Sequence, residues 1–351
     1  MNMLLPLAWI LGVFAGAWWL TGQVRRYAVV KHVLDVPNER SSHSVATPRG
    51  GGIAIVVAML ATLPVAASLD WLPWAHVWAV VGSGTVVAAV GFTDDHRHLR
   101  RRWRLLGHVA AAMWVLAWLG GLPPLPLFGA TSDLGWIGHL LTAVYIVWLI
   151  NLTNFMDGID GIAATEAVTV AGCGALLLAL SVPGDRQWIA PALLAAAAAG
   201  FLVWNWPPAK IFMGDSGSGF LGLAFAALSL QAAWAAPPLF WSWAILLGVF
   251  VVDATVTLLR RALGGELIYS AHRTHAYQHA SGRLGAHKPV TLAVAAINLF
   301  WLFPLALLVA RDSLSGSTGV LVAYAPLVVV AAWLGAGVSR PSSARLDTPH
   351  V

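Results

Sequence analysis

The chain has 351 residues, of which 59% are hydrophobic and only 10% are charged, and its formal net charge is +5. Soluble domains carry roughly 25% charged residues, so the composition excludes a soluble protein. Apolar stretches of about 20 residues recur along the chain, the length that an α-helix needs to cross roughly 30 Å of hydrocarbon. We therefore expect an all-α, polytopic transmembrane helical bundle with about ten to eleven spans.

The predicted spans cover residues 4–24, 50–69, 76–93, 104–121, 135–152, 161–182, 187–204, 217–236, 239–260, 290–310 and 318–338. We expect one integral-membrane domain over residues 1–339 and a short, polar, disordered cytoplasmic tail over 340–351. The first segment lacks a basic stretch before it and a small-residue cleavage site after it, so we interpret it as a retained span. The single cysteine, Cys173, falls inside a span, which excludes a disulfide framework and favours a buried, inert thiol.

The cations predict the orientation of the spans. With the N-terminus outside, 18 of the 20 Lys and Arg fall on one side, leaving Arg186 and Arg311 on the other. The positive-inside rule makes that side cytoplasmic. The excess of basic residues then reflects loop topology and an anionic ligand. No motif indicates a nucleic-acid partner.

Six aspartates also gather at the edges of the same loops: Asp35, Asp94, Asp95, Asp157, Asp160 and Asp215. Acidic residues contribute little to orientation, so topology explains them poorly. Acids and bases together at one membrane face are typical of a site for a metal and an anionic substrate. Solvated loop charges are the alternative.

The first two cytoplasmic loops carry donors and an acid pair. Arg40, His43 and Arg49 precede three glycines that would let backbone approach a phosphate, although a turn-rich connector would look the same. In the second loop, Asp94 and Asp95 are adjacent carboxylates that repel each other unless a cation lies close, and such a carboxylate can accept a proton from a nucleophile. The arginines that follow could compensate the acids or anchor the membrane edge.

The third and fourth loops favour metal and phosphate binding. Asn154, Asp157 and Asp160 alternate with glycines, and Mg2+ prefers a few hard oxygen donors together with waters or substrate phosphates. Asp157 or Asp160 could instead cap a helix. In the fourth loop, Asp215 and its Gly and Ser neighbours lead into a helix whose N-terminus would attract an anion, and Phe212 could stack on a base. Plain capping and packing are the alternatives.

The last long loop is rich in histidine and arginine. It contains His272, Arg273, His275 and His279, followed by Arg283 and His287-Lys288. Zinc is one interpretation, but no cysteine assists, and neutral imidazole among arginines favours contact with phosphate or sugar oxygens.

With these loops in this order, the chain resembles the polyprenyl-phosphate N-acetylhexosamine-1-phosphate transferases. The resemblance runs from Asp35 to about residue 290 and is carried by five loop motifs on one membrane face. It implies Mg2+, with Mn2+ as a substitute, held by Asn154 and Asp215. It also implies that undecaprenyl phosphate and a UDP-N-acetylamino sugar are the substrates, and that the protein lies in the bacterial inner membrane with its site facing the cytoplasm and can form a homodimer.

The resemblance also assigns the remaining candidate residues. Phe212, Gly158 and Asp160 would form the uridine pocket. Asp94 and Asp95 would lie near the lipid phosphate and Asp157 among the catalytic acids, with Asp94 as the candidate base. Arg104 would lie near the phosphates, and Arg273, His275 and His279 would contact the pyrophosphate and the amino sugar.

The last loop departs from the peptidoglycan branch, which carries three consecutive histidines where this chain has His275-Ala-Tyr-Gln-His279. This departure argues against a muramoyl-pentapeptide donor, which is kept as the alternative. The loop looks more like that of O-antigen-initiating enzymes, whose donors include UDP-linked N-acetylglucosamine and N-acetylated 6-deoxyhexoses. A two-step route through a phospho-aspartyl enzyme stays open. A transporter is the rival class, because an intramembrane acid such as Asp253 can mark an ion pathway. Asp253 could instead pair with Arg260 or simply face a helix contact.

Overall fold

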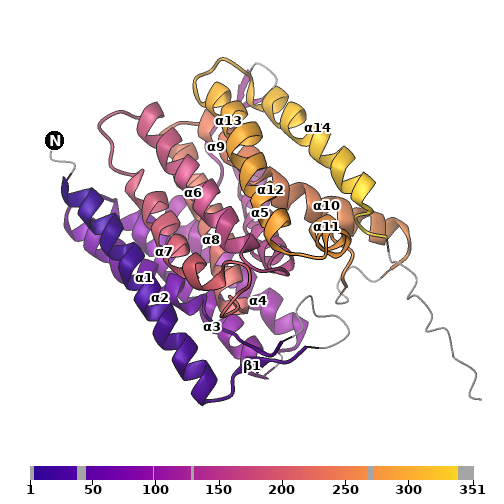
Figure 1. Cartoon of the computed structure of the whole chain (residues 1–351). Coiled ribbons are helices and arrows are strands. Elements are labelled where there is room, and N and C mark those ends of the chain that lie inside the picture. Colours follow the sequence, from indigo (N-terminus) through magenta and orange to yellow (C-terminus); the bar gives the residue numbers. More distant parts are fainter. Residues whose placement is uncertain (1–3, 38–44, 98, 128–129, 267–271, 339–351) are drawn as a thin grey trace, which may run out of the picture.

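The computed structural model describes residues 4–37, 45–97, 99–127, 130–266 and 272–338, and this part of the chain is almost entirely helical (Figure 1). Two short hairpins pair β1 (Leu34–Asp35) with β2 (Thr47–Pro48) and β3 (Leu125–Leu127) with β4 (Ala130–Ser132). The tail predicted at 340–351, and the candidate donors Arg40 and His43, lie outside the described residues.

The helices of the first half are α1 (Leu4–Val30), α2 (Ile53–Ser68), α3 (Trp74–Arg97), α4 (Arg101–Leu119), α5 (Gly135–Met156), α6 (Ile162–Ser181) and α7 (Ile189–Asn205). The second half contains α8 (Asp215–Ala235), α9 (Pro238–Leu246), α10 (Gly248–Leu263), α11 (Ala276–Leu284), α12 (Lys288–Ile297), the π-helix η1 (Asn298–Leu302), α13 (Phe303–Ala310) and α14 (Gly316–Leu334). Each of the eleven predicted spans falls on one of these helices or on a consecutive group of them. The expected polytopic helical bundle is confirmed.

The number of clear membrane-spanning helices is smaller than the ten to eleven that we expected. Seven helical segments of the described chain are long and apolar enough to cross a membrane, or eight if α9 and α10 form one span bent by 68°. Helices α2 and α7 are apolar but have only 16 and 17 residues. Helix α4 begins with arginines at 101, 102 and 104, which lower its hydropathy. These three helices account for the difference from ten or eleven.

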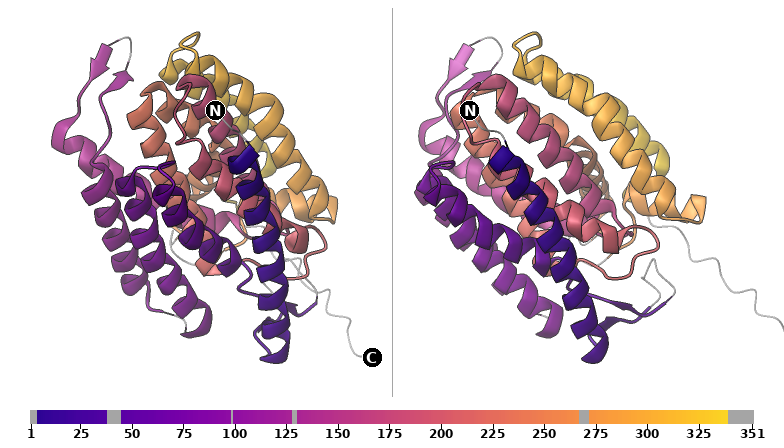
Figure 2. Two further views of the ribbon diagram at one scale, coloured as in Figure 1. Left: turned by 90° about the vertical axis from the view of Figure 1, so that its left-hand side faces the viewer. Right: turned by 60° about the vertical axis from the view of Figure 1, so that its left-hand side comes forward.

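Helix α8 is the centre of the bundle. Of its most apolar 18-residue window, 89% is buried, against 22% for α1 and for α14. In Figure 1 the indigo and purple N-terminal helices and the yellow α14 lie on opposite sides of it, and Figure 2 shows the same arrangement from two other directions. A side chain at Gly222 would lie 2.3 Å from Leu149 O in α5, and one at Gly217 would lie 2.6 Å from the Cα of Gly52. Small residues therefore let backbones pack closely, as in membrane helices generally.

The predicted cytoplasmic loops meet at one end of this bundle. The N–H of Gly51 donates to Phe212 O at 2.9 Å, and the N–H of Phe212 donates to Pro48 O at 2.8 Å. The outer connections meet at the opposite end, where the Trp234 and Trp241 indoles donate to Gly121 O and Pro126 O. The buried Cys173 is a free thiol, as expected.

Candidate active site

The candidate site lies where three helices end or begin. Gly91 in the last turns of α3 touches the first residue of α8, because a Cβ on Gly91 would lie 2.5 Å from the backbone of Asp215. Asn154, near the end of α5, donates from Nδ2 to Asp215 Oδ1 at 2.9 Å and to Ser218 Oγ at 3.0 Å. The structure thus joins two residues that are 61 positions apart and that the sequence assigned to one metal site.

The acid pair at the end of α3 divides between two environments. Asp94 is 8% exposed, forms an ion pair with Arg104 at 2.7 Å and accepts the N–H of Leu99 at 2.7 Å. Asp95 accepts the N–H of Asp215 at 3.3 Å, and its Oδ2 lies 3.5 Å from Ser216 Oγ. Repulsion between adjacent carboxylates is therefore relieved by a guanidinium on one and by the N-terminus of α8 on the other.

Asp157 follows α5 directly and faces the other acids. Burial, together with the charges of Asp215, Asp95 and Asp160, raises the pKa of Asp157 to about 7. A carboxylate among like charges and without a bound cation gains from holding a proton, whereas a cation would favour its charged form. The arrangement suits a group that responds to a metal.

The donor set can be compared with what Mg2+ needs. Among the described residues no three His, Cys, Asp or Glu side chains converge as a metal-binding group. Mg2+, however, usually takes one or two carboxylates and completes its octahedron with waters and substrate phosphates. A cavity of about 10 Å3, close to what one water-sized particle requires, is lined by Asp94, Asn154 and Asp215. The residues present fit such an ion if the Asn154 amide, whose Nδ2 donates to Asp215 and Ser218 here, turns over to offer its oxygen instead.

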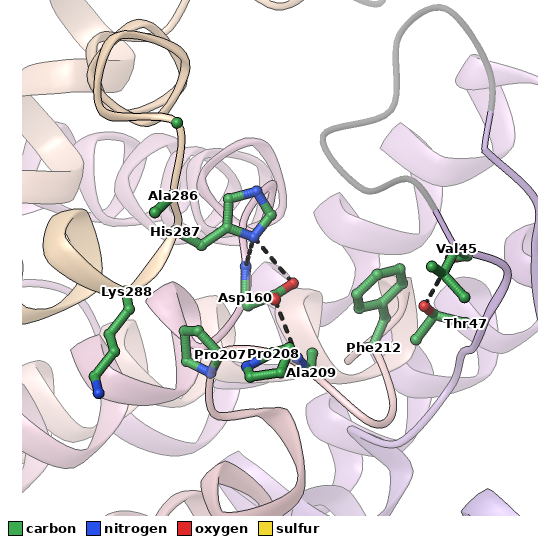
Figure 3. Close-up of a pocket in the computed structure, with 11 residues that line it drawn as sticks. Val45, Thr47, Asp160, Pro207, Pro208, Ala209, Phe212, Ala286, His287 and Lys288 are labelled. Carbon is green, nitrogen blue, oxygen red and sulfur yellow. Dashed lines mark hydrogen bonds and ion pairs between the residues drawn. The ribbon is translucent and has the colours of Figure 1, made fainter.

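A larger pocket of about 600 Å3 lies beside the acids (Figure 3). Phe212 and Asp160 line it, as expected, together with Pro207, Pro208 and His287. Asp160 Oδ2 accepts the N–H of Ala209 at 3.0 Å, and Oδ1 lies 3.2 Å from His287 Nδ1. The half-buried Phe212 ring faces the pocket on the side opposite His287, which leaves a flat surface and a polar edge facing each other.

Gly158 has a packing role that the sequence did not indicate. A Cβ at this position would lie 2.0 Å from Tyr277 Oη, which donates to Phe155 O at 3.0 Å. Tyr277 belongs to α11, so the missing side chain lets the histidine-rich segment dock on the α5–α6 loop. The structure places Gly158 against this tyrosine, and the 600 Å3 pocket is not lined by it.

Arg273 and His275, two of the candidate ligands in the last loop, differ in exposure. Arg273 is exposed and lies close enough to Tyr277 to act against the burial and the negative charges that hold that phenol's pKa well above its usual range. His275 is 2% exposed, and its ring stacks on those of Phe155 and His272, with ring centroids 6.4 Å and 4.9 Å apart. Burial lowers the pKa of His272 to about 4, so this imidazole is neutral at pH 7.

His279 lies elsewhere. Its Nδ1 is 3.0 Å from Leu334 O at the end of α14, its ring packs beside Gly335, and Arg283 donates to the same carbonyl at 3.1 Å. The structure does not bring His279 to the acids. His287, which the sequence offered only as a member of the loop, contacts Asp160 instead. The separation of 127 residues left no local signal for that contact.

Asp253 contacts a neighbouring helix and does not pair with Arg260. It is 5% exposed and accepts the N–H groups of Ala276 and Tyr277, both at 2.9 Å. Arg260 instead donates to Ala336 O at 3.0 Å, so the expected pairing of Asp253 with Arg260 is wrong. The acid satisfies the first amides of α11, which would otherwise be buried without partners. An ion pathway is not needed to explain it.

The fold and this site define a polytopic helical membrane protein with an acidic, metal-compatible centre beside an open pocket. Residues 77–233 match Glycosyl transferase family 4. The chain is 31% identical over 310 residues, covering 78% of this chain and 75% of the relative, to the decaprenyl-phosphate N-acetylglucosaminephosphotransferase of Mycobacterium tuberculosis. The chain belongs to glycosyl transferase family 4 and is a phosphosugar transferase.

Three further relatives show the breadth of the likeness. A probable undecaprenyl-phosphate N-acetylglucosaminyl 1-phosphate transferase of Bacillus subtilis is 29% identical over 80% of this chain and 79% of its own. A phospho-N-acetylmuramoyl-pentapeptide-transferase of Moorella thermoacetica is 33% identical, but over only 53% of this chain and 61% of its own. The corresponding transferase of Synechococcus elongatus is 29% identical over 73% of this chain and 71% of its own.

Proposed function

We propose that this protein transfers an N-acetylamino-sugar 1-phosphate from a UDP-sugar to undecaprenyl phosphate, releasing UMP. The observation that carries the proposal is the convergence of Asp95, Asn154 and Asp215 between helix ends, next to a pocket that contains Phe212 and Asp160. The names of the N-acetylglucosaminyl relatives support a polyprenyl-phosphate acceptor and an N-acetylhexosamine 1-phosphate as the transferred group.

The donor nucleotide occupies the 600 Å3 pocket in this proposal. Its base stacks on Phe212, and Asp160, held by Ala209 N and His287, presents acceptors to the base or ribose. The pyrophosphate then extends toward Asn154 and Asp215. Arg273, exposed on the neighbouring loop, supplies positive charge to the pyrophosphate or the sugar.

The residues Asn154 and Asp215 would hold Mg2+, or Mn2+ in its place. The bound ion would draw charge from the pyrophosphate and improve the leaving group. The charges of Asp215, Asp95 and Asp160 already act on Asp157, so a cation bound at Asp215 would act on it as well. Two observations support an ion here: the oxygen donors of these side chains, and the small cavity that Asp94, Asn154 and Asp215 line.

The acid pair positions the acceptor. A lipid phosphate oxygen attacks the sugar-bearing phosphorus, the bond from that phosphorus to the UMP oxygen breaks, and UMP leaves. Asp94, the expected base, is held at 2.7 Å by Arg104 and at 2.7 Å by Leu99 N, whereas Asp95 has only longer contacts, to Asp215 N at 3.3 Å and Ser216 Oγ at 3.5 Å. Asp95 is therefore the better placed of the two to accept a proton from the lipid phosphate. A phosphate monoester is already largely ionised at pH 7, so positioning and charge stabilisation carry most of the effect.

An N-acetylglucosaminyl or related amino-sugar donor is favoured over a muramoyl-pentapeptide donor, because the last loop lacks the three consecutive histidines of the peptidoglycan branch. The relatives of Bacillus subtilis and Mycobacterium tuberculosis, which cover 80% and 78% of this chain, support the same choice, although a muramoyl-pentapeptide transferase covers 73%. The product would be the lipid-linked sugar that initiates O-antigen or another cell-envelope polysaccharide. The enzyme would lie in the bacterial inner membrane with its acids facing the cytoplasm, as the cation distribution predicts, and could act as a homodimer.

A donor panel tests the proposal. Purified protein is given undecaprenyl phosphate, Mg2+ or EDTA, and UDP-linked N-acetylglucosamine, N-acetylated 6-deoxyhexoses or muramoyl pentapeptide, while UMP release is followed. We expect Mg2+-dependent UMP from an amino-sugar donor and about a thousandfold loss in Asp215→Asn. Asp312→Asn is the matched control, because Asp312 is exposed at the opposite end of the bundle and its φ of 53° suits asparagine. No Mg2+-dependent UMP from any donor, or full activity in Asp215→Asn, would contradict the proposal.

A further inference from the structure

A second cavity, of about 320 Å3, lies on the other side of the acid pair, among α1, α2 and α3. Its wall is mostly apolar and includes Val24, Ala28, Val33, Ile53 and Phe92. One end is polar and is formed by Arg49, Asp95, His96 and Ser216. The cavity is therefore amphipathic, with charge at the end nearest the candidate site. Pockets of this size are typical of small-ligand sites, which run from about 300 to 1,000 Å3.

Asp95 connects this cavity to the reaction centre. Its carboxylate lines the cavity and also accepts the N–H of Asp215. The separation is thin, because a Cβ on Gly214 would lie 2.9 Å from Asp95 Oδ2 and 3.1 Å from Gly50 Cα. Asp94 lines the small cavity on the opposite side instead. A group held at the polar end would thus lie beside the first turn of α8, next to Asp215.

The cavity also opens toward the lipid-facing surface. Tyr27 and Phe92 both line it and are 61% and 52% exposed. Large aromatic side chains at the mouth of an apolar cavity, near the membrane edge, suit a ligand that enters sideways from the bilayer. A water-soluble nucleotide would have little to gain from these walls.

We propose that this cavity binds the phosphate end and the first isoprene units of the acceptor lipid, with Arg49 as the phosphate ligand and Asp95 beside the attacking oxygen. This inference rests on the proposed function. One apolar cavity with one polar end fits a single-chain phosphate monoester, whereas a glycerophospholipid would require space for two acyl chains. The positive charge of Arg49 attracts the phosphate. Because it also acts on Asp95, it offsets the repulsion between the phosphate and the Asp95 carboxylate.

Filling the cavity tests the proposal. Ala28→Phe places a ring in the apolar part, and Val30→Phe is the matched control on the same helix, because Val30 is 73% exposed and Ala28 only 1%. We expect Ala28→Phe to raise KM for undecaprenyl phosphate about tenfold with KM for the UDP-sugar unchanged, and Val30→Phe to change neither. Arg49→Ala should raise the same acceptor KM, in contrast to the exposed Arg26→Ala. Unchanged acceptor KM in both Ala28→Phe and Arg49→Ala would overturn the proposal.

Photolabelling separates the failure of this site from that of the reaction. Wild-type protein is irradiated with a diazirine-bearing farnesyl phosphate, with undecaprenyl phosphate or phosphatidylglycerol as competitor. We expect label on peptides containing residues 24–33, 49–53 or 92–96, displaced by the prenyl phosphate and not by the phospholipid. This result without UMP release from any donor would sink the proposed reaction and support the lipid site. UMP release with label only elsewhere, or label displaced by phosphatidylglycerol, would sink the lipid site alone. Ala28→Phe should lose the label even if its activity cannot be measured.

Discussion

Asp253 Oδ2 accepts the backbone N–H of Tyr277 at 2.9 Å, which fixes a buried acid of α10 to the first turn of α11. The same carboxylate accepts the N–H of Ala276 and the hydroxyl of Thr257, at 2.9 and 3.1 Å. Tyr277 in turn donates to Phe155 O, so the chain of contacts runs from α10 through α11 to the last turn of α5.

Replacing Asp253 should therefore loosen α11 and lower activity from a distance. Asp253→Ala removes the acceptor of two buried amides, and hydrogen bonds to a charged group contribute about 1.5–3 kcal/mol each. We expect faster hydrogen exchange across residues 272–285 and a higher donor KM. Asp312→Asn, at an exposed position at the opposite end of the bundle, is the comparison. Unchanged exchange in this segment would contradict the docking role, and loss of an ion flux would favour a transporter.

The pairing of Asp94 with Arg104 predicts strong coupling between the two residues. Arg104→Gln leaves a nearly buried carboxylate without its guanidinium, and breaking such a pair costs about 3–5 kcal/mol. We expect a large loss of thermal stability and activity in Arg104→Gln, and partial recovery of stability in Asp94→Asn/Arg104→Gln. A double-mutant cycle measures the coupling. Additive single effects would show that the two side chains act independently.

Local sequence signals predicted the helices and the loops well. Apolar length identified every span region, because the bilayer sets the length of a crossing helix. Local motifs also identified Asn154 in the third loop and Phe212 and Asp215 in the fourth as candidate residues, and the family resemblance assigned Asn154 and Asp215 to one metal site. The structure brings Asn154 into hydrogen bonding with Asp215, while their role as metal ligands stays a prediction.

Contacts across long separations could not be predicted in the same way. His287 meets Asp160, and Asp253 meets α11, only because α10, α11 and α12 fold back over the α5–α6 loop. The resemblance gave His279 the same role as His275, but His275 is the N-cap of α11 with an extended backbone, whereas His279 lies inside that helix with its Nδ1 3.0 Å from Leu334 O. The cavity beside Asp95 likewise requires the packing of α1 against α2, which no single loop motif encodes.

The close approach of Gly158 and Tyr277 predicts a specific rescue. Gly158→Ala puts a methyl group 2.0 Å from Tyr277 Oη, so either the tyrosine or the loop must move. We expect reduced stability and a higher donor KM, measured by thermal unfolding and steady-state kinetics. Tyr277→Phe removes that oxygen, and the double variant should recover part of the loss. Recovery would be incomplete because Tyr277 Cζ still lies 3.0 Å from the new carbon. A double variant worse than Gly158→Ala would contradict this explanation.

Asp157 predicts how activity should depend on pH and metal. Its pKa is raised from 3.8 to about 7 by burial and by neighbouring acids, so the folded protein holds this proton below about pH 7 when no cation is bound. If the carboxylate is the active form, activity should fall as pH drops through 7 at low Mg2+. Saturating Mg2+ favours the charged form and should move this acid limb to lower pH, whereas Asp157→Asn should abolish the Mg2+-dependent shift. The raised pKa also means that, without metal, Asp157 destabilises the fold increasingly as pH rises from about 4 to 7. In EDTA, Asp157→Asn should therefore unfold at a higher temperature than wild type at pH 8, with a smaller difference at pH 4. An acid limb independent of Mg2+ would assign the titration to another group.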